Sequence, residues 1–163
     1  MPETVKHPIA PVFDENSCVL VLGSFPSVKS REEMFFYGHP QNRFWRVIAS
    51  VFDAEEPKTL EEKRAFLLES GVALWDVLAS CEIEGSADST IKNAVPNDLT
   101  EILTVAKIET IFVNGKTAEK YYNKYMKKLL GRSAVCLPST SPANAAWSAE
   151  RLTLAWKAAF EKN

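Results

Sequence analysis

Residues 18–27 read CVLVLGSFPS, a short apolar run that leads into a loop of small and polar residues. The run Cys18–Leu22 is too short and too continuously apolar for a half-exposed strand, so it predicts a strand buried on both faces. Three further runs have the same character: Val72–Val77, Thr110–Val113 and Ala134–Leu137. Strands of this kind are typical of a parallel sheet whose two faces are covered.

Helical patterns lie between and after these runs, because apolar residues recur there every three or four positions. They cover Phe44–Val51, Leu99–Leu103, Ala118–Leu129 and a last helix from about Ser148 that carries Leu152, Trp156 and Phe160 on one face. Thr59 and Glu62 form a capping-box pattern that opens another helix. The alternating order predicts an α/β fold of three layers, α/β/α, with a central four-stranded parallel sheet.

The composition is that of one folded domain covering residues 1–163, since 46% of the residues are hydrophobic and 25% are charged. Residues 1–12 contain three prolines and are expected to form an extended arm. The formal net charge of −2 argues against a broad electrostatic grip on nucleic acid, so any DNA contact must be local.

No apolar run approaches the ~20 residues of a membrane span, and no secretory signal opens the chain. We therefore expect no membrane partner and a reducing cytoplasm. The three cysteines (Cys18, Cys81 and Cys136) form no CxxC motif, and the chain has two histidines, His7 and His39. These cysteines and histidines do not have the number or spacing of a zinc site or an iron–sulfur cluster, so we expect neither a metal nor a cofactor.

Ligands of open α/β sheets bind at the carboxyl ends of the strands. Those ends carry Gly23–Ser27, Asp76, Asn114–Thr117 and Pro138–Asn144, and three of these segments are rich in Gly, Ser, Thr or Asn. A glycine at the first of them lets backbone approach a ligand. Because three of the four strand ends carry segments of this composition, we expect a binding site at this edge of the sheet.

Each motif also has a plain structural interpretation. Gly23–Ser27 and Pro138–Asn144 fit ordinary turns, and Asn42 fits a cap at the start of a helix. Asp76 fits a helix cap or a solvated carboxylate. The six basic residues between Lys116 and Arg132 fit a solvated helix face, with one or two of them on phosphate.

The motifs of two further protein classes, triphosphate-binding proteins and serine hydrolases, are excluded. Gly115-Lys116-Thr117 lacks the glycine that a triphosphate-binding loop needs five residues earlier, where this chain has Thr110. No GxSxG motif is present for a serine hydrolase, and only the two histidines could serve as its base.

Taken together and in order, the remaining segments resemble the uracil-DNA glycosylase superfamily. The resemblance is greatest to the hypoxanthine-DNA (deoxyinosine) glycosylase branch, family 6. The matching segments are 23–27 (GSFPS), 37–45 (YGHPQNRFW), 74–77 (LWDV) and 137–144 (LPSTSPAN). The second of them is also similar to a segment of mismatch-specific uracil-DNA glycosylases, which supports the superfamily.

The resemblance implies roles for individual residues. Gly23, Ser24 and Phe25 would form the first catalytic motif, beside the sugar and the attacking water. Tyr37 would stack on the flipped base, and Asn42 would be the polar residue associated with catalysis.

The second motif, Pro138–Asn144, would contact backbone phosphates and wedge the duplex open. Its expected DNA contacts are Ser139, Thr140, Ser141 and Asn144. Three further candidates lie at strand ends. Lys116 is a candidate for phosphate contact, and Asp76 and Asn114 are candidates for reading base edges. His39 is a candidate donor to the departing base.

One departure affects the expected substrate. Most of the superfamily places a catalytic Asp, Asn or Glu in the first motif, where this sequence has Ser24 and Phe25. This favours the deoxyinosine branch over ordinary uracil activity. The cysteine clusters of the iron–sulfur branches are missing, which excludes those branches.

We therefore expect a monomeric, monofunctional DNA glycosylase that removes a flipped-out deaminated base, hypoxanthine above all, with uracil and mismatched thymine as further candidates. Its partner would be DNA containing such a base, and flipping it out would cost a few kcal/mol. The alternative is a non-catalytic module that binds nucleic acid or a nucleotide on the same scaffold and releases no base.

Overall fold

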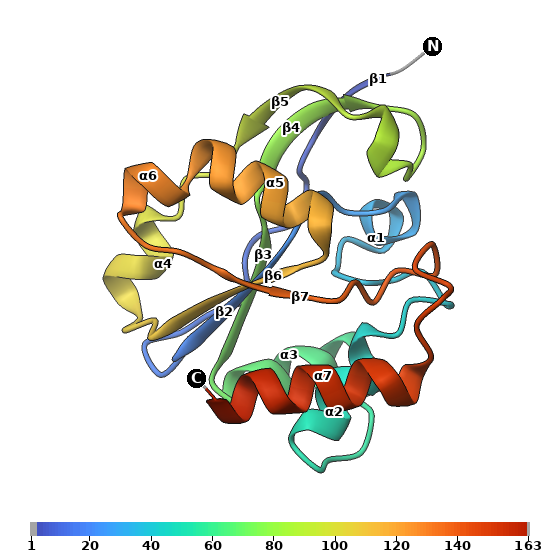
Figure 1. The fold of residues 1–163 in the computed structure, drawn as a ribbon, viewed down its shortest axis with the longest axis vertical. Coiled ribbons are helices and arrows are strands. Elements are labelled where there is room, and N and C mark those ends of the chain that lie inside the picture. The colour runs from blue at the N-terminus through green and yellow to red at the C-terminus, as the bar shows by residue number, and fades with distance from the viewer. Residues whose placement is uncertain (1–2, 163) are drawn as a thin grey trace.

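The computed structural model describes residues 3–162 and is built around a four-stranded parallel sheet (Figure 1). Its strands lie in the order β3-β2-β6-β7. They are β2 (Val19–Gly23), β3 (Val72–Asp76), β6 (Thr110–Asn114) and β7 (Val135–Leu137). Each lies within one residue of a predicted run at both ends, and helices cover both faces of the sheet. The three-layer α/β/α prediction is confirmed.

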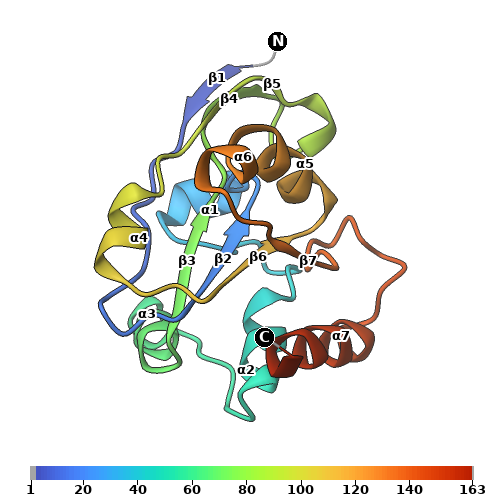
Figure 2. The ribbon, with the colours of Figure 1, turned by 60° about the vertical axis from the view of Figure 1, so that its left-hand side comes forward.

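Alternate residues of the strands face two separate cores. Val21 and Phe112 belong to the core beneath α2 (Phe44–Val51), α3 (Leu60–Glu69) and α7 (Ala149–Lys162). Leu20 and Ile111 face the other core, covered by α4 (Thr100–Val105), α5 (Lys116–Tyr125) and α6 (Lys127–Leu130). Figures 1 and 2 show these two groups of helices on opposite sides of the sheet.

Local sequence accounts for most helix ends. The predicted capping box opens α3: the Glu62 amide donates to Thr59 Oγ1 at 3.0 Å, and the Thr59 amide donates back to Glu62 Oε1 at 3.0 Å. One prediction is wrong. The pattern extended a single helix to Leu129, but α5 ends at Tyr125 and the chain turns at Met126. The short α6 that follows leaves Leu129 82% exposed.

A second sheet was not predicted. It is antiparallel, with strand order β1-β4-β5, where β1 is Glu3–Lys6, β4 is Leu78–Ile83 and β5 is Lys92–Pro96. Only Val77 separates β3 from β4, so the chain passes directly from one sheet into the other.

The expected extended arm is held by this second sheet. Residues 1–2 of the arm lie outside the described part of the chain. Residues 3–6 pair with β4, and Val12 forms a bridge with Leu74 of the parallel sheet. The arm therefore packs along the domain and passes the carboxyl end of β3.

No helix within residues 3–162 is both long and apolar enough to cross a membrane.

Candidate active site

A cavity of about 270 Å³ opens at the carboxyl end of the parallel sheet. Pockets for small ligands typically begin near 300 Å³, roughly. Eleven of the predicted site residues line it: Gly23, Ser24, Phe25, Tyr37, His39, Asn42, Asp76, Asn114, Ser139, Thr140 and Ser141. The other two, Lys116 and Asn144, line an adjoining cavity of about 550 Å³.

The floor of the cavity depends on a close approach at Gly23. Gly23 and Asp76 are partners in the register between β2 and β3. A Cβ atom on residue 23 would lie 2.3 Å from Asp76 Oδ1 and 3.0 Å from the Tyr37 hydroxyl. Glycine is therefore required here to leave room for both groups.

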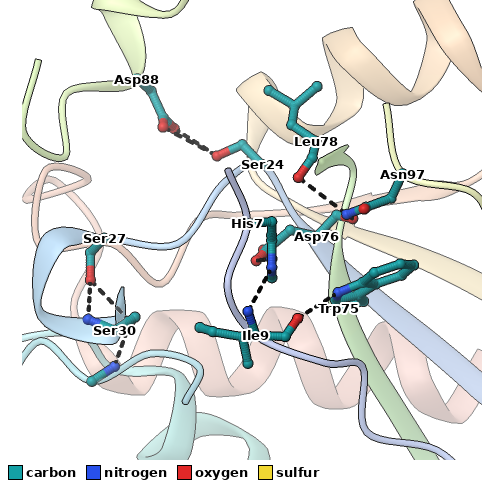
Figure 3. Close-up of polar contacts among 11 residues, drawn as sticks. His7, Ile9, Ser24, Ser27, Ser30, Trp75, Asp76, Leu78, Asp88 and Asn97 are labelled. Carbon is teal, nitrogen blue, oxygen red and sulfur yellow. Dashed lines mark hydrogen bonds and ion pairs between the residues drawn. The ribbon is translucent and has the colours of Figure 1, made fainter. Parts of the chain in front are cut away.

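Asp76 is paired with a histidine from the arm. His7 Nε2 lies 2.7 Å from Asp76 Oδ2, and the two side chains are only 3% and 5% exposed (Figure 3). The Ile9 amide donates to His7 Nδ1 at 3.2 Å, so Nδ1 is an acceptor and the ring proton lies on Nε2, where it is donated to the carboxylate. Asp76 is thus neither a helix cap nor a solvated carboxylate.

Sequence reasoning gave His7 no role in the site. It lies 69 residues from its partner, in the proline-containing arm, and nothing in the local sequence marks the contact. The arm is held in place because Trp75 Nε1 donates to the Ile9 carbonyl at 3.0 Å.

Tyr37 stacks on Phe44, with ring centroids 4.2 Å apart and planes 18° apart. Its φ of 52° is left-handed, a strained conformation for a residue with a side chain. The pKa of Tyr37 is raised well above its ordinary value, first because the phenol is buried and then because Asp76 is negative. Its hydroxyl accepts a hydrogen bond from Asn114 Nδ2 at 3.2 Å.

Asn114 also fastens the second motif to the sheet. Its Nδ2 donates to Thr140 Oγ1 at 3.0 Å, and its Oδ1 accepts from the Thr140 amide at 3.1 Å. Thr140 is fully buried, so the phosphate contact expected of it is not open to it in this structure. Ser139 and Ser141 are partly exposed hydroxyls of the same loop.

Asn42 both caps the start of a helix and lines the cavity. Its Oδ1 accepts from the Phe44 amide at 2.9 Å, so the side chain does cap the start of α2. Because Asn42 lines the cavity, this bond also fixes the orientation of its side-chain amide there. Its Nδ2 donates to no protein acceptor in the described part of the chain.

His39 is oriented by a backbone bond in the same loop. The Gln41 amide donates to its Nδ1 at 3.1 Å, which leaves the proton on Nε2. No protein group within residues 3–162 takes that proton. His39 therefore presents a hydrogen-bond donor to the cavity that it lines.

Arg43 holds the second motif in place, a role that sequence reasoning missed. Its guanidinium donates to the carbonyls of Ser141 at 2.8 Å, Asn144 at 3.1 Å and Trp147, and its Nε to that of Thr140 at 3.4 Å. Arg43 lies inside the 37–45 segment, but these acceptors follow about a hundred residues later. No local signal links them.

A serine pair joins the loop Gly23–Ser27, here the first loop, to the loop Tyr37–Asn42. Ser27 caps α1 (Val28–Glu33) by accepting from the Ser30 amide at 3.1 Å. The buried Ser30 Oγ accepts from the Gly38 amide at 2.9 Å. The two predicted segments are thereby brought to the same side of the cavity.

A second carboxylate, which sequence reasoning also missed, faces the first loop. Both carboxylate oxygens of Asp88 lie 3.2 Å from Ser24 Oγ, which donates to them. Asp88 is an exposed residue, but its carboxylate is partly desolvated, which raises its pKa; the hydrogen bond from Ser24 opposes this rise, and the negative charge of Asp76 adds to it. The cavity thus holds two carboxylates in different surroundings, one paired with a histidine and one with a hydroxyl.

Comparisons with known proteins match nearly the whole chain. The model of the uracil DNA glycosylase superfamily matches residues 10–161. A protein named hypoxanthine DNA glycosylase from Methanosarcina acetivorans is 34% identical over 158 residues, which cover 96% of this chain and 98% of that protein. One of the same name from Methanosarcina barkeri is 30% identical over 159 residues, 96% and 99% of the two chains.

The fold is shared with a solved structure. The solution NMR structure of a candidate uracil DNA glycosylase from Methanosarcina acetivorans superposes with a TM-score of 0.81 at 32% identity, and the match covers 97% of each chain.

Proposed function

The chain belongs to the uracil DNA glycosylase superfamily, and from that premise we propose that it is a DNA glycosylase that hydrolyses the N-glycosidic bond of a deaminated base, above all hypoxanthine. The observation that carries the proposal is the single cavity that gathers the first loop, the Tyr37–Asn42 loop and the second motif at the carboxyl end of the sheet. Two relatives that bear the name hypoxanthine DNA glycosylase support the choice of base.

The target base must leave the duplex to reach this cavity. Flipping costs a few kcal/mol, and less for a deaminated base that pairs badly. Stacking on the Tyr37 ring, which Phe44 supports from behind, returns about 1–3 kcal/mol.

Asp76 is suited to read an N–H edge of the base. One carboxylate oxygen accepts from His7, and the other lies next to Gly23 and the Tyr37 hydroxyl. A carboxylate accepts from the N1–H of hypoxanthine but repels the N1 lone pair of adenine. This would separate the deaminated base from its parent. Uracil also has a ring N–H, so Asp76 alone does not reject it.

Asn114 has less capacity for this task, because its amide is bonded to Tyr37 and Thr140. Its proposed part is to hold the stacking ring and the second motif at a fixed separation.

Cleavage separates charge between the sugar and the base. Without a carboxylate in Gly23–Ser27, the bond breaks largely before water attacks, so the sugar becomes positive and the base negative. The Nε2–H of His39 and backbone N–H groups of the first loop can stabilise the departing base. Asn42 has no useful basicity, but its fixed amide can hold the water near the sugar carbon.

DNA contacts would be local. Ser139 and Ser141 offer hydroxyls beside the cavity, and Asn144 and Lys116 line the adjoining one. Arg43 takes no direct part, since its guanidinium is bonded to loop carbonyls.

We also propose that the enzyme acts as a monomer, because eleven predicted site residues of this one chain meet in one cavity. The three cysteines are free thiols, in keeping with a reducing cytoplasm. No group of three or more His, Cys, Asp or Glu side chains placed to hold a metal ion occurs among residues 3–162.

The test is a duplex that carries one deoxyinosine, incubated with excess enzyme and then treated with alkali. We expect strand cleavage at the lesion and release of free hypoxanthine. Matched duplexes with uracil, xanthine or mismatched thymine define the range of bases.

A mobility shift without free base would identify the non-catalytic binding module instead. Absence of any alkali-labile site in the deoxyinosine duplex would contradict the proposed activity.

A further inference from the structure

The cavity wall contains a carboxylate that the proposed chemistry has not used. Asp88 opens the short 3-10 helix Asp88–Thr90 in the connection between β4 and β5. Figure 3 shows it across Ser24 from the buried His7–Asp76 pair. It lines both the cavity and the adjoining one, so it lies at the boundary between them.

The segment that carries Asp88 is fastened to the first loop and α1. The Val28 amide donates to Ser86 Oγ at 2.8 Å, and Arg31 Nη2 donates to the Gly85 carbonyl at 2.9 Å. With Ser24 bonded to both carboxylate oxygens at 3.2 Å, the position of Asp88 relative to the first loop is fixed.

Hydrolysis requires an acceptor for a proton. The bond between the sugar carbon and the base nitrogen breaks, and its electron pair leaves with the base, which takes up a proton from solvent. The proton that the attacking water loses returns to solvent at the end of the cycle. The water oxygen bonds to the sugar carbon and must lose one proton to become the hydroxyl of the abasic site. The Asn42 amide cannot take that proton at neutral pH.

Of the two carboxylates that line the cavity, Asp76 lies at the buried floor and accepts from His7. Asp88 is exposed and lies beside the first loop, within hydrogen-bond distance of Ser24. We infer that Asp88 is the catalytic base, which accepts the proton of the attacking water held by Asn42. This inference rests on the proposed glycosylase function.

The surroundings of Asp88 suit this role. A carboxylate is a better base when its pKa is raised toward the working pH. Desolvation and the charge of Asp76 act in that direction, against the opposing hydrogen bonds from Ser24 and Thr117. The other titratable groups that interact with it are Tyr37, Cys81 and Tyr121, which are neutral at pH 7.

The experiment compares Asp88→Asn with Ser24→Ala in single-turnover release of hypoxanthine from the deoxyinosine duplex. An asparagine keeps an oxygen to accept from Ser24 but cannot take a proton, so we expect Asp88→Asn to lower the rate at least about a hundredfold with no loss of DNA affinity. Ser24→Ala removes the bond to Asp88 but keeps the base, and a loss of about tenfold or less is expected.

The pH dependence of the release rate distinguishes a catalytic base from a residue that only holds the first loop in place. The parent rate should fall as acid protonates Asp88, and this acidic limb should disappear in Asp88→Asn and persist in Ser24→Ala. Asp88→Asn within threefold of an active parent, or equal losses in both variants with the acidic limb retained, would overturn this role while the glycosylase function stands. A parent that releases no base would overturn both.

Discussion

The two histidines of the chain sit in the same local arrangement and differ in what they face. In the arm, the amide of Ile9 donates to Nδ1 of His7, and in the loop before α2, the amide of Gln41 donates to Nδ1 of His39. Each ring therefore offers an Nε2–H. The one on His7 ends on the buried Asp76 carboxylate, whereas the one on His39 meets no protein acceptor within residues 3–162.

This contrast divides the cavity into a floor and a rim. On the floor, Asp76, Tyr37 and Asn114 are bonded to other protein groups, which fixes their shape before any ligand arrives. On the rim, His39 and Asn42 are oriented by backbone amides and keep capacity for a ligand. Substitutions on the floor should therefore lower stability as well as base recognition, whereas those on the rim should lower mainly the rate.

The largest effect is expected from His7→Ala. It leaves the Asp76 carboxylate buried without a partner, and breaking a buried pair in this way costs about 3–5 kcal/mol. Urea unfolding should report the loss as a lower midpoint with an unchanged slope. His39→Ala is the matched control, since it removes the other histidine from a more exposed position and should lower stability by less than about 1 kcal/mol. Equal losses would abolish the distinction between floor and rim.

Asn42→Ala should give the next largest effect, and on rate. We expect single-turnover hypoxanthine release to fall at least about a hundredfold, equivalent to about 2.7 kcal/mol, with little change in DNA binding. Asn42→Asp should keep part of the activity, because a carboxylate can orient the same water but repels the departing anion.

Asn42→Ala also removes the cap at the start of α2, and the loss of a cap costs about 1 kcal/mol of stability. Asn42→Ser retains a capping oxygen and serves as the control for stability. A rate within threefold of the parent in Asn42→Ala would show that the residue is only a cap.

His39→Ala should lower the same rate about tenfold, since a hydrogen bond to a charged group contributes about 1.5 kcal/mol. The effect should be largest for the least acidic leaving base, which needs the donor most. His39→Gln retains an N–H donor on a side chain of similar length and should recover part of the rate. If both variants match the parent, the free Nε2–H has no catalytic use.

The strands and most helices could be predicted because they depend on local burial patterns. The β2 run is apolar at every position, and Thr59 and Glu62 cap α3 within four residues of each other. The place of the site followed from topology, since parallel strands bring their carboxyl ends to one edge. The short, largely exposed β1 gave no comparable signal.

The contacts that complete the site could not be predicted, because each joins residues far apart in the sequence. His7 reaches Asp76 over 69 positions, and Ser24 reaches Asp88 over 64. Arg43 spans 98 positions to the Ser141 carbonyl. The carboxylates come close to the first loop and the arm because β3 runs on into β4. The carbonyls that Arg43 binds come close to it because the second motif folds back over α2. Nothing in the residues themselves specifies such a juxtaposition.

The smallest effect is expected at Lys116, at the outer edge of the rim. Its cavity also contains Asp88, so a phosphate there meets one positive and one negative side chain. Lys120 and Lys124 lie over the rings of Tyr121 and Tyr125, at 5.2 Å and 5.1 Å. With Arg43 bonded to carbonyls, one or two cations are left for DNA beside the site.

Each neutralised phosphate contributes roughly −0.9 to the slope of log K against log salt, which gives about −1 to −2 for the parent. Lys116→Ala should weaken binding by only a fewfold and make that slope shallower by about 0.9, without changing the rate of base release at saturation. A parent slope steeper than about −5 would mean that a wide basic surface, and not this local edge, holds the DNA.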